Sequence, residues 1–169
     1  MKKLVFLLIS WVMIPGGLLA QNFETDLESK SEILKLEFIT GNWEGKGWMM
    51  GQDGQKHHFD QTENITFKLD STAILIEGQG EANGRSVHDA LAVISFDKES
   101  KNYTFTSWLA NGRGGQFKAA LIDDKFYWYP NENMQYVISL NEKGQWHETG
   151  EIRQGDKWFQ FFEMTLDRK

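Results

Sequence analysis

The sequence predicts an all-β protein: a single antiparallel up-and-down β-barrel of about ten strands, preceded by one helix. After Gly41 the chain consists of short segments rich in aromatic and β-branched residues, and turn residues separate each segment from the next. These links are too short for parallel crossovers, which need roughly a dozen residues or more. Only Glu24–Thr40 has the mixed three- and four-residue apolar spacing of an amphipathic helix.

Ten strands are expected, and the turn between the third and the fourth is the clearest, because Asn83-Gly84 suits the positive φ of a type I′ turn. A meander of this length has two exposed edges unless its first and last strands pair, so closure into a barrel is favoured over a two-sheet sandwich. The expected strands are Asn42–Met50, His57–Leu69, Ala73–Glu81, Ser86–Phe96, Asn102–Ala110, Gln116–Ile122, Phe126–Tyr129, Met134–Leu140, Trp146–Arg153 and Trp158–Leu166.

The first 20 residues have the pattern of a secretory signal peptide. Lys2 and Lys3 precede an apolar run that ends at Ile14, and Ala20 supplies the small residue before the expected cleavage. The apolar run is too short to span a bilayer, which takes about 20 residues. We therefore expect export to the periplasm or the extracellular space, with residues 1–20 as the leader, 21–40 as the helical segment and 41–169 as the barrel.

The composition of the chain limits the kinds of partner that it is expected to bind. Loss of Lys2 and Lys3 from the 18 basic residues leaves 16 against 24 acidic ones, a net charge of −8. With no basic cluster, nucleic acid is a poor partner. There is no cysteine to form a disulfide or carry a lipid, so no membrane anchor is expected after cleavage. The sequence does not indicate an oligomeric state.

Gly41-Asn42-Trp43, directly after the expected helix, has the G-x-W form that opens the first strand of lipocalin-like barrels. The chain resembles that calycin superfamily. The resemblance implies that Trp43 closes the base of the barrel beneath a basic side chain from the end of the last strand, for which Arg168 is the candidate. A guanidinium over an indole is physically favourable. Gly41, Trp43 and Arg168 are thus expected to be structural.

The longer pattern, in which Gly45 and Gly47 follow Trp43, also resembles the start of nitrobindin, a haem-binding barrel of the same superfamily. That family takes its iron ligand from a histidine near the chain's end. The last strand here has none, and His147 is the nearest substitute. The whole pattern, including the closing FFEMTLDR, is more similar to a bacterial family of secreted lipocalin-like domains of unknown function, which implies no catalytic residues.

Side-chain alternation predicts which residues line the interior. If Trp43 points inward, Met49 does too and Trp48 points outward. The interior face of the last strand would hold Trp158, Gln160, Phe162, Met164 and Leu166. Such a lining is mostly apolar with a few polar atoms, as in small-molecule pockets. Either a cavity or a solidly packed core fits the pattern, and the width of ten strands favours a cavity.

No complete catalytic motif is present. The four histidines, His57, His58, His88 and His147, have no recognised metal-ligand spacing, and no metal site is predicted. An acid–base site would need the barrel to bring His88 close to Glu148 or Glu163.

We therefore predict an exported binding protein that holds a small apolar or amphipathic molecule inside the barrel and needs no cofactor. The alternatives are a haem protein that uses His147, an enzyme that uses His88 with a glutamate, and a barrel that only docks other proteins. The residues expected at the ligand are Trp43, Met49, His88, Trp108, Trp128, Tyr136, Glu148 and Met164.

Overall fold

The structure is a computed structural model that describes residues 24–169. The expected signal peptide and its cleavage site lie outside the described residues. One α-helix, α1 (Leu27–Leu34), and a short 3₁₀-helix, η1 (Glu37–Ile39), precede ten strands. The strands are β1 (Gly41–Met50), β2 (Lys56–Lys68), β3 (Ala73–Ala82), β4 (Arg85–Asp97), β5 (Asn102–Leu109), β6 (Gly114–Ile122), β7 (Lys125–Asn131), β8 (Met134–Leu140), β9 (Trp146–Gln154) and β10 (Lys157–Arg168).

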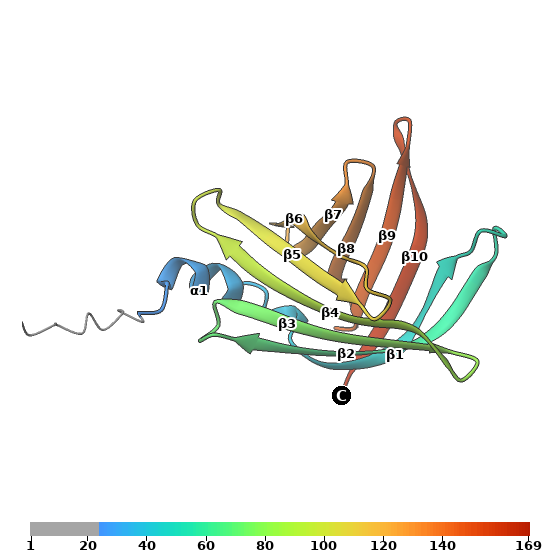
Figure 1. Ribbon diagram of the computed structural model, residues 1–169, viewed down its shortest axis with the longest axis horizontal. Helices are drawn as coiled ribbons and strands as arrows, with labels where there is room; N and C mark the ends of the chain where they lie inside the picture. Colours follow the sequence, from blue (N-terminus) through green and yellow to red (C-terminus); the bar gives the residue numbers. More distant parts are fainter. Residues whose placement is uncertain (1–23) are drawn as a thin grey trace, which may run out of the picture.

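The strands form a closed antiparallel barrel in which each strand pairs with its neighbours in the chain (Figure 1). The ring closes between β1 and β10, whose register runs from Trp43 opposite Arg168 to Met49 opposite Phe162. Closure satisfies the backbone groups of both terminal strands, which would otherwise form exposed edges. The predicted up-and-down barrel is confirmed, and the two-sheet sandwich is excluded.

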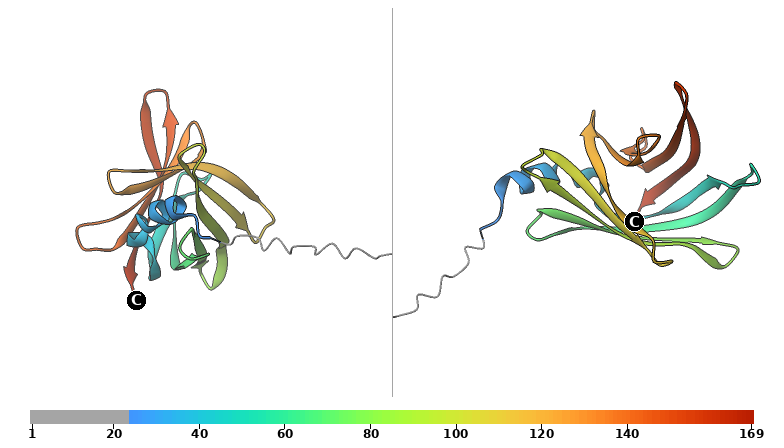
Figure 2. Two further views of the ribbon diagram at one scale, coloured as in Figure 1. Left: turned by 90° about the vertical axis from the view of Figure 1, so that its left-hand side faces the viewer. Right: turned by 45° about the horizontal axis from the view of Figure 1, so that its top comes forward.

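The helical segment covers one end of the barrel, as seen when that end faces the viewer (Figure 2). It is two short helices rather than the single helix expected over Glu24–Thr40. The Asp26 carboxylate caps the first turn of α1 by accepting a hydrogen bond from the Ser29 backbone N–H, and α1 ends at Leu34. Ile33, Leu36 and Ile39 are fully buried and close the interior at this end. Within residues 24–169, no helix has the length and apolar character needed to span a membrane.

Trp43 and Arg168 join the helical segment to the closing strands. The Arg168 guanidinium carbon lies 4.2 Å from the centre of the Trp43 indole, in the position expected for a cation–π contact. Arg168 also donates hydrogen bonds to the carbonyl oxygens of Thr40 and Phe38, at 2.6 and 3.2 Å. The Trp43 indole N–H donates to the carbonyl of Ile39 at 2.9 Å. These bonds satisfy carbonyl groups that the end of η1 leaves without helical partners.

Two glycines of β1 lie where another side chain approaches the backbone too closely for a Cβ atom. Gly41 has a φ of +124°, and a Cβ there would lie 2.6 Å from an Arg168 guanidinium nitrogen. Gly47 lies beneath the ring of Phe59, which packs across the strand where a side chain would stand. The spacing of glycines around Trp43 therefore serves the Arg168 contact and the packing of the barrel wall.

The last strand departs from simple alternation. The register between β9 and β10 shifts between Gln160 and Phe162, which leaves Phe161 as an extra residue. Such a bulge reverses the faces of the residues before it. Gln160 pairs with Glu151 and donates to Glu163. Gln160 and Trp158 therefore lie on the outer face, and their predicted inward orientation is wrong.

Replacing Trp43 tests the packing at the closed end. Trp43 is 1% exposed and packs edge-to-face against Trp146. We expect Trp43→Ala to lower the free energy of unfolding by about 3–5 kcal/mol, as large truncations in a core do. The matched control is Trp108→Ala, because Trp108 is 50% exposed on the outside of the barrel. Denaturant unfolding measures both, and a loss below about 1 kcal/mol for Trp43→Ala would contradict the packing role.

Candidate functional site

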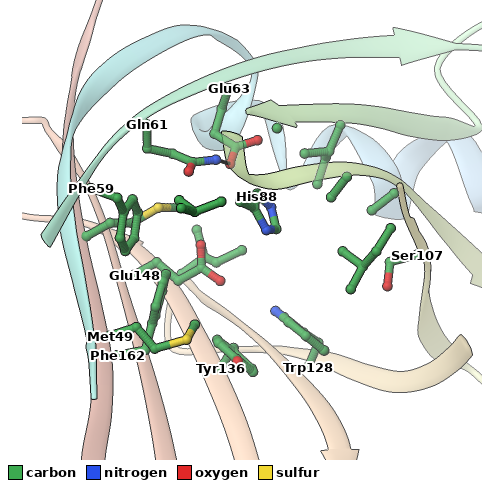
Figure 3. A pocket seen from close by; sticks show the side chains of 18 of the residues that line it. Met49, Phe59, Gln61, Glu63, His88, Ser107, Trp128, Tyr136, Glu148 and Phe162 are labelled. Atoms are coloured by element: carbon green, nitrogen blue, oxygen red, sulfur yellow. Dashed lines mark hydrogen bonds between the residues drawn. The ribbon is translucent and has the colours of Figure 1, made fainter. Parts of the chain in front are cut away.

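The end of the barrel opposite α1 contains a cavity of about 720 Å³. Its mouth lies beside the β1–β2, β3–β4 and β5–β6 turns, where Met49 and Val87 are partly exposed and Arg113, His57 and His58 stand at the rim. The interior walls are mostly apolar, with a few polar side chains (Figure 3). The apolar lining includes Phe59, Ile76, Ala92, Phe105, Phe117, Trp128, Tyr136, Ile138, Trp146, Phe162 and Met164, and the polar lining includes Gln61, Glu63, His88, Ser107 and Glu148.

Glu63 and Gln61 project into this cavity from β2. They are 7% and 3% exposed, and the Gln61 amide nitrogen donates a 2.7 Å hydrogen bond to one oxygen of Glu63. The other carboxyl oxygen of Glu63 is buried without a partner. Across the sheet these residues pair with Gly78 and Gly80, where a Cβ would lie 2.7 Å and 2.5 Å from their side-chain oxygens. The two glycines of β3 therefore make room for a buried polar pair.

Glu148 projects into the same cavity from β9 and is 7% exposed. In Figure 3 its carboxyl group points into the space that Gln61 and Glu63 also face. The indole N–H groups of Trp128 and Trp146 lie near Glu148 and favour its ionised form. Neither makes a hydrogen bond of good geometry. Glu148 therefore has two potential donors nearby and no close partner.

Burial shifts the protonation of both carboxyl groups. Desolvation raises the pKa of Glu63 to about 7, although the hydrogen bond from Gln61 opposes the rise. Desolvation raises the pKa of Glu148 to about 8, and the nearby charge of Glu63 adds to that rise. Glu148 is therefore largely protonated at neutral pH, whereas Glu63 is close to half-protonated.

Stacked aromatic rings form the wall beside the carboxyl groups. Trp128 is stacked between Phe105 and Tyr136, with ring centres 4.5 Å and 4.3 Å away and planes nearly parallel. Phe162 meets the Tyr136 ring edge-to-face. The stack covers both faces of Trp128, and its indole nitrogen is buried, so a molecule in the cavity would meet the edge of this ring rather than its face.

His88 lines the cavity from β4, and burial lowers its pKa, against the opposing charge of Asp89. It is therefore neutral at neutral pH. At the rim, His57 lies 3.0 Å from a carboxylate oxygen of Asp53. Among the described residues, Arg113 is the one lysine or arginine in the lining, and no salt bridge reaches Glu63 or Glu148.

Six of the eight residues predicted at the ligand line this cavity, namely Met49, His88, Trp128, Tyr136, Glu148 and Met164. Trp43 does not line it: the ring is buried toward the closed end, against Trp146. Trp108 does not line it either. It pairs with Leu91 and alternates with Ser107 and Leu109, which do face the cavity, so Trp108 lies on the outer face. Their predicted places at the ligand are corrected accordingly.

The sequence analysis missed Gln61 and Glu63. They belong to the run FDQTENITF, in which polar residues occupy both faces of the strand, so alternation gives no indication of which face is buried. One signal was present: Gly78 and Gly80 alternate on β3 within otherwise ordinary strand. Such glycines often mark a place where another group approaches the backbone closely.

His147 points away from the cavity. It lies 3.1 Å from a carboxylate oxygen of Glu163, which also accepts hydrogen bonds from Trp48 and Gln160. Partial burial favours the neutral acid, but these donors hold the pKa of Glu163 below its usual value. An iron ligand from His147 would therefore lie outside the barrel, and the interior does not fit haem bound in that way. Glu163 alternates with Phe162 and Met164, which line the cavity, so it lies on the outer face and does not meet His88 inside.

Within residues 24–169, no group of three histidine, aspartate or glutamate side chains converges as a metal site. The sequence matches no protein-family model and no curated protein. Among solved structures, the crystal structure of Rv2717c from M. tuberculosis matches with a TM-score of 0.59 and 9% sequence identity. The match covers 81% of this chain and 96% of that one. At this identity the likeness shows the fold alone, and a closed ten-stranded antiparallel barrel fits the calycin-like architecture.

The raised pKa values predict how stability depends on pH. Between pH 7 and pH 8 the unfolded chain has both carboxyl groups ionised, whereas folding keeps protons on Glu148 and in part on Glu63. Stability is therefore lost as pH rises through this window, by up to about 1.4 kcal/mol per pH unit for each protonated group. His88, whose pKa burial lowers, adds a smaller slope of the opposite sign near pH 7, because the unfolded chain still holds part of that proton, and this slope fades toward pH 8.

Urea unfolding of the wild type and of Glu148→Gln across this window measures the effect. The variant should lose much of the slope, because glutamine has no proton to lose. Glu77→Gln is the matched control, since Glu77 is exposed on the outer face of β3. Equal slopes in all three proteins would show that Glu148 is ionised in the folded state.

Proposed function

We propose that this chain is an exported binding protein that holds a small amphipathic molecule in the open half of its barrel. The observation that carries the proposal is the combination of a large, mostly apolar cavity with three buried polar side chains, Gln61, Glu63 and Glu148. Ligand sites have this composition: apolar walls supply affinity, and a few fixed polar groups orient the ligand. A barrel interior with no binding role would be expected to fill with apolar side chains.

The apolar part of the ligand would lie against Phe105, Trp128, Tyr136 and Phe162, and its polar end would reach Glu148 and Glu63. Met49 and Met164 suit such a site because their unbranched side chains adapt to the shape of a bound molecule. Both line the cavity, Met49 near the mouth and Met164 in the interior. Glu148 pairs with Ile138, deeper in the barrel than Tyr136 opposite Gly150, so the polar end would enter first and the apolar body would follow it.

Export is the second part of the proposal and rests on the leader pattern of residues 1–20. The mature chain is expected to begin at Gln21, and intact mass of the protein recovered outside the cytoplasm decides the matter. A retained Met1 would contradict export by cleavage.

Nile red, an uncharged fluorophore, tests whether the cavity admits an apolar molecule. We expect its emission to rise and shift to the blue when it binds, because the cavity walls are apolar. Ser107→Trp places a large ring inside the cavity from β5 and should weaken binding by roughly tenfold or more, because it fills the space the dye occupies.

The matched control is Thr106→Trp, which adds the same ring on the opposite face of the same strand. Thr106 pairs with Val93 and Gln116 and does not line the cavity. Its affinity for Nile red should stay at the wild-type value. Equal binding by both variants, or no binding by the wild type, would contradict a ligand cavity.

A further inference from the structure

The two buried carboxyl groups bear on the charge of the ligand. Glu63 on β2 and Glu148 on β9 face one cavity, with β1 and β10 between their strands, and each is nine-tenths buried or more. One oxygen of Glu63 has no hydrogen-bond partner. Acidic side chains are rarely buried without a basic partner, because an uncompensated charge is costly in a low-dielectric interior.

The donors near these groups satisfy them only in part. The Gln61 amide donates to Glu63, and the indoles of Trp128 and Trp146 face Glu148. Among the described residues, the bond from Gln61 is thus the one hydrogen bond of good geometry to either carboxyl group, and one oxygen of Glu63 remains buried without a donor. A group that brings several N–H donors and a positive charge would complete the arrangement, whereas a carboxylate would meet like charge.

We propose that the ligand is a small organic amine that carries its positive charge at Glu63 and Glu148 and its apolar body against the aromatic wall. This inference rests on the binding function proposed above and names the ligand's chemical class. The ammonium group would donate hydrogen bonds to the free oxygen of Glu63 and to Glu148. Ammonium–carboxylate bonds of this kind are stronger than neutral ones.

Binding of an amine should release a proton from the protein. An arriving cation favours the ionised form of a carboxyl group, so the pKa of Glu148 falls from its raised value and its proton leaves. The amine keeps its own proton, because its pKa resembles that of lysine, about 10. The other titratable or charged side chains that face the cavity are His57, His58, His88, Arg113 and Tyr136.

The experiment is calorimetric titration with three compounds that share one skeleton: naphthylethylamine, naphthylethanol and naphthylpropanoate. We expect the amine to bind about tenfold or more tightly than the alcohol, and the acid to bind least. Measurements near pH 8 in buffers of different ionisation enthalpy should show a fraction of a proton released per amine bound and none per alcohol. His88, whose pKa burial lowers, carries no proton to release at that pH.

Glu148→Gln and Glu63→Gln separate charge from shape. Each should lower affinity for the amine about tenfold or more while leaving affinity for the alcohol within about threefold. Glu77→Gln, exposed on the outer face, should change neither. Proton release by the wild type tests the inference even if a variant fails to fold.

The outcomes are distinct. Equal or tighter binding of the alcohol or the acid overturns the amine assignment, and Nile red uptake would still support the binding function. Uptake of Nile red without measurable binding of the amine also overturns the assignment. Failure of Nile red and of all three compounds overturns the binding function and the amine together.

Discussion

Pairing of β1 with β10 is the constraint on which the rest of the structure depends. Without it the chain would be a curved sheet with two free edges and no enclosed interior. Arg168 contributes to this closure at the point where the two strands meet the helical segment, through the Trp43 ring and the carbonyls of Phe38 and Thr40. Gly41 leaves the space that the guanidinium needs. The short stretch GNWEGKGW therefore supports closure of the barrel.

Closure creates an interior in which Glu63 and Glu148 are buried, and this burial gives the two carboxyl groups their unusual chemistry. In solvent Glu63 and Glu148 would ionise near their ordinary pKa, whereas burial raises both into the neutral range. Glycine at positions 78 and 80 leaves space for the side chains of Glu63 and Gln61, although apolar residues at these positions would pack the wall. Strongly shifted carboxyl groups in a cavity are typical of sites that bind or react.

Much of the fold could be predicted from the sequence because each turn carries its own local signal. The ten strands and their closure needed only turn chemistry and the cost of exposed edges. Helix bounds were less accurate, because the break between α1 and η1 depends on packing of Leu36 and Ile39 beneath the barrel. The bulge at Phe161 has no local signal, since Trp158 and Gln160 continue the alternation of Phe162 without interruption.

The site was predicted in part. Glu148 stood out because it shares a face with Trp146 and Gly150, so its burial followed from alternation. Glu63 did not, because its strand is polar on both faces, and its burial depends on pairing with Trp43 across the sheet. Trp108 was misplaced for a related reason: β5 has aromatic rings on both faces, and only its register with Leu91 shows which face is outside.

The most direct test of this account is a carbon NMR titration of the glutamate side-chain carboxyl groups, with Glu63→Gln and Glu148→Gln used for assignment. The account predicts that Glu63 titrates near pH 7 and Glu148 near pH 8, well apart from the exposed glutamates. If both groups instead titrate near the ordinary value of about 4.3, they are not buried in the folded protein, and the account of the site is wrong.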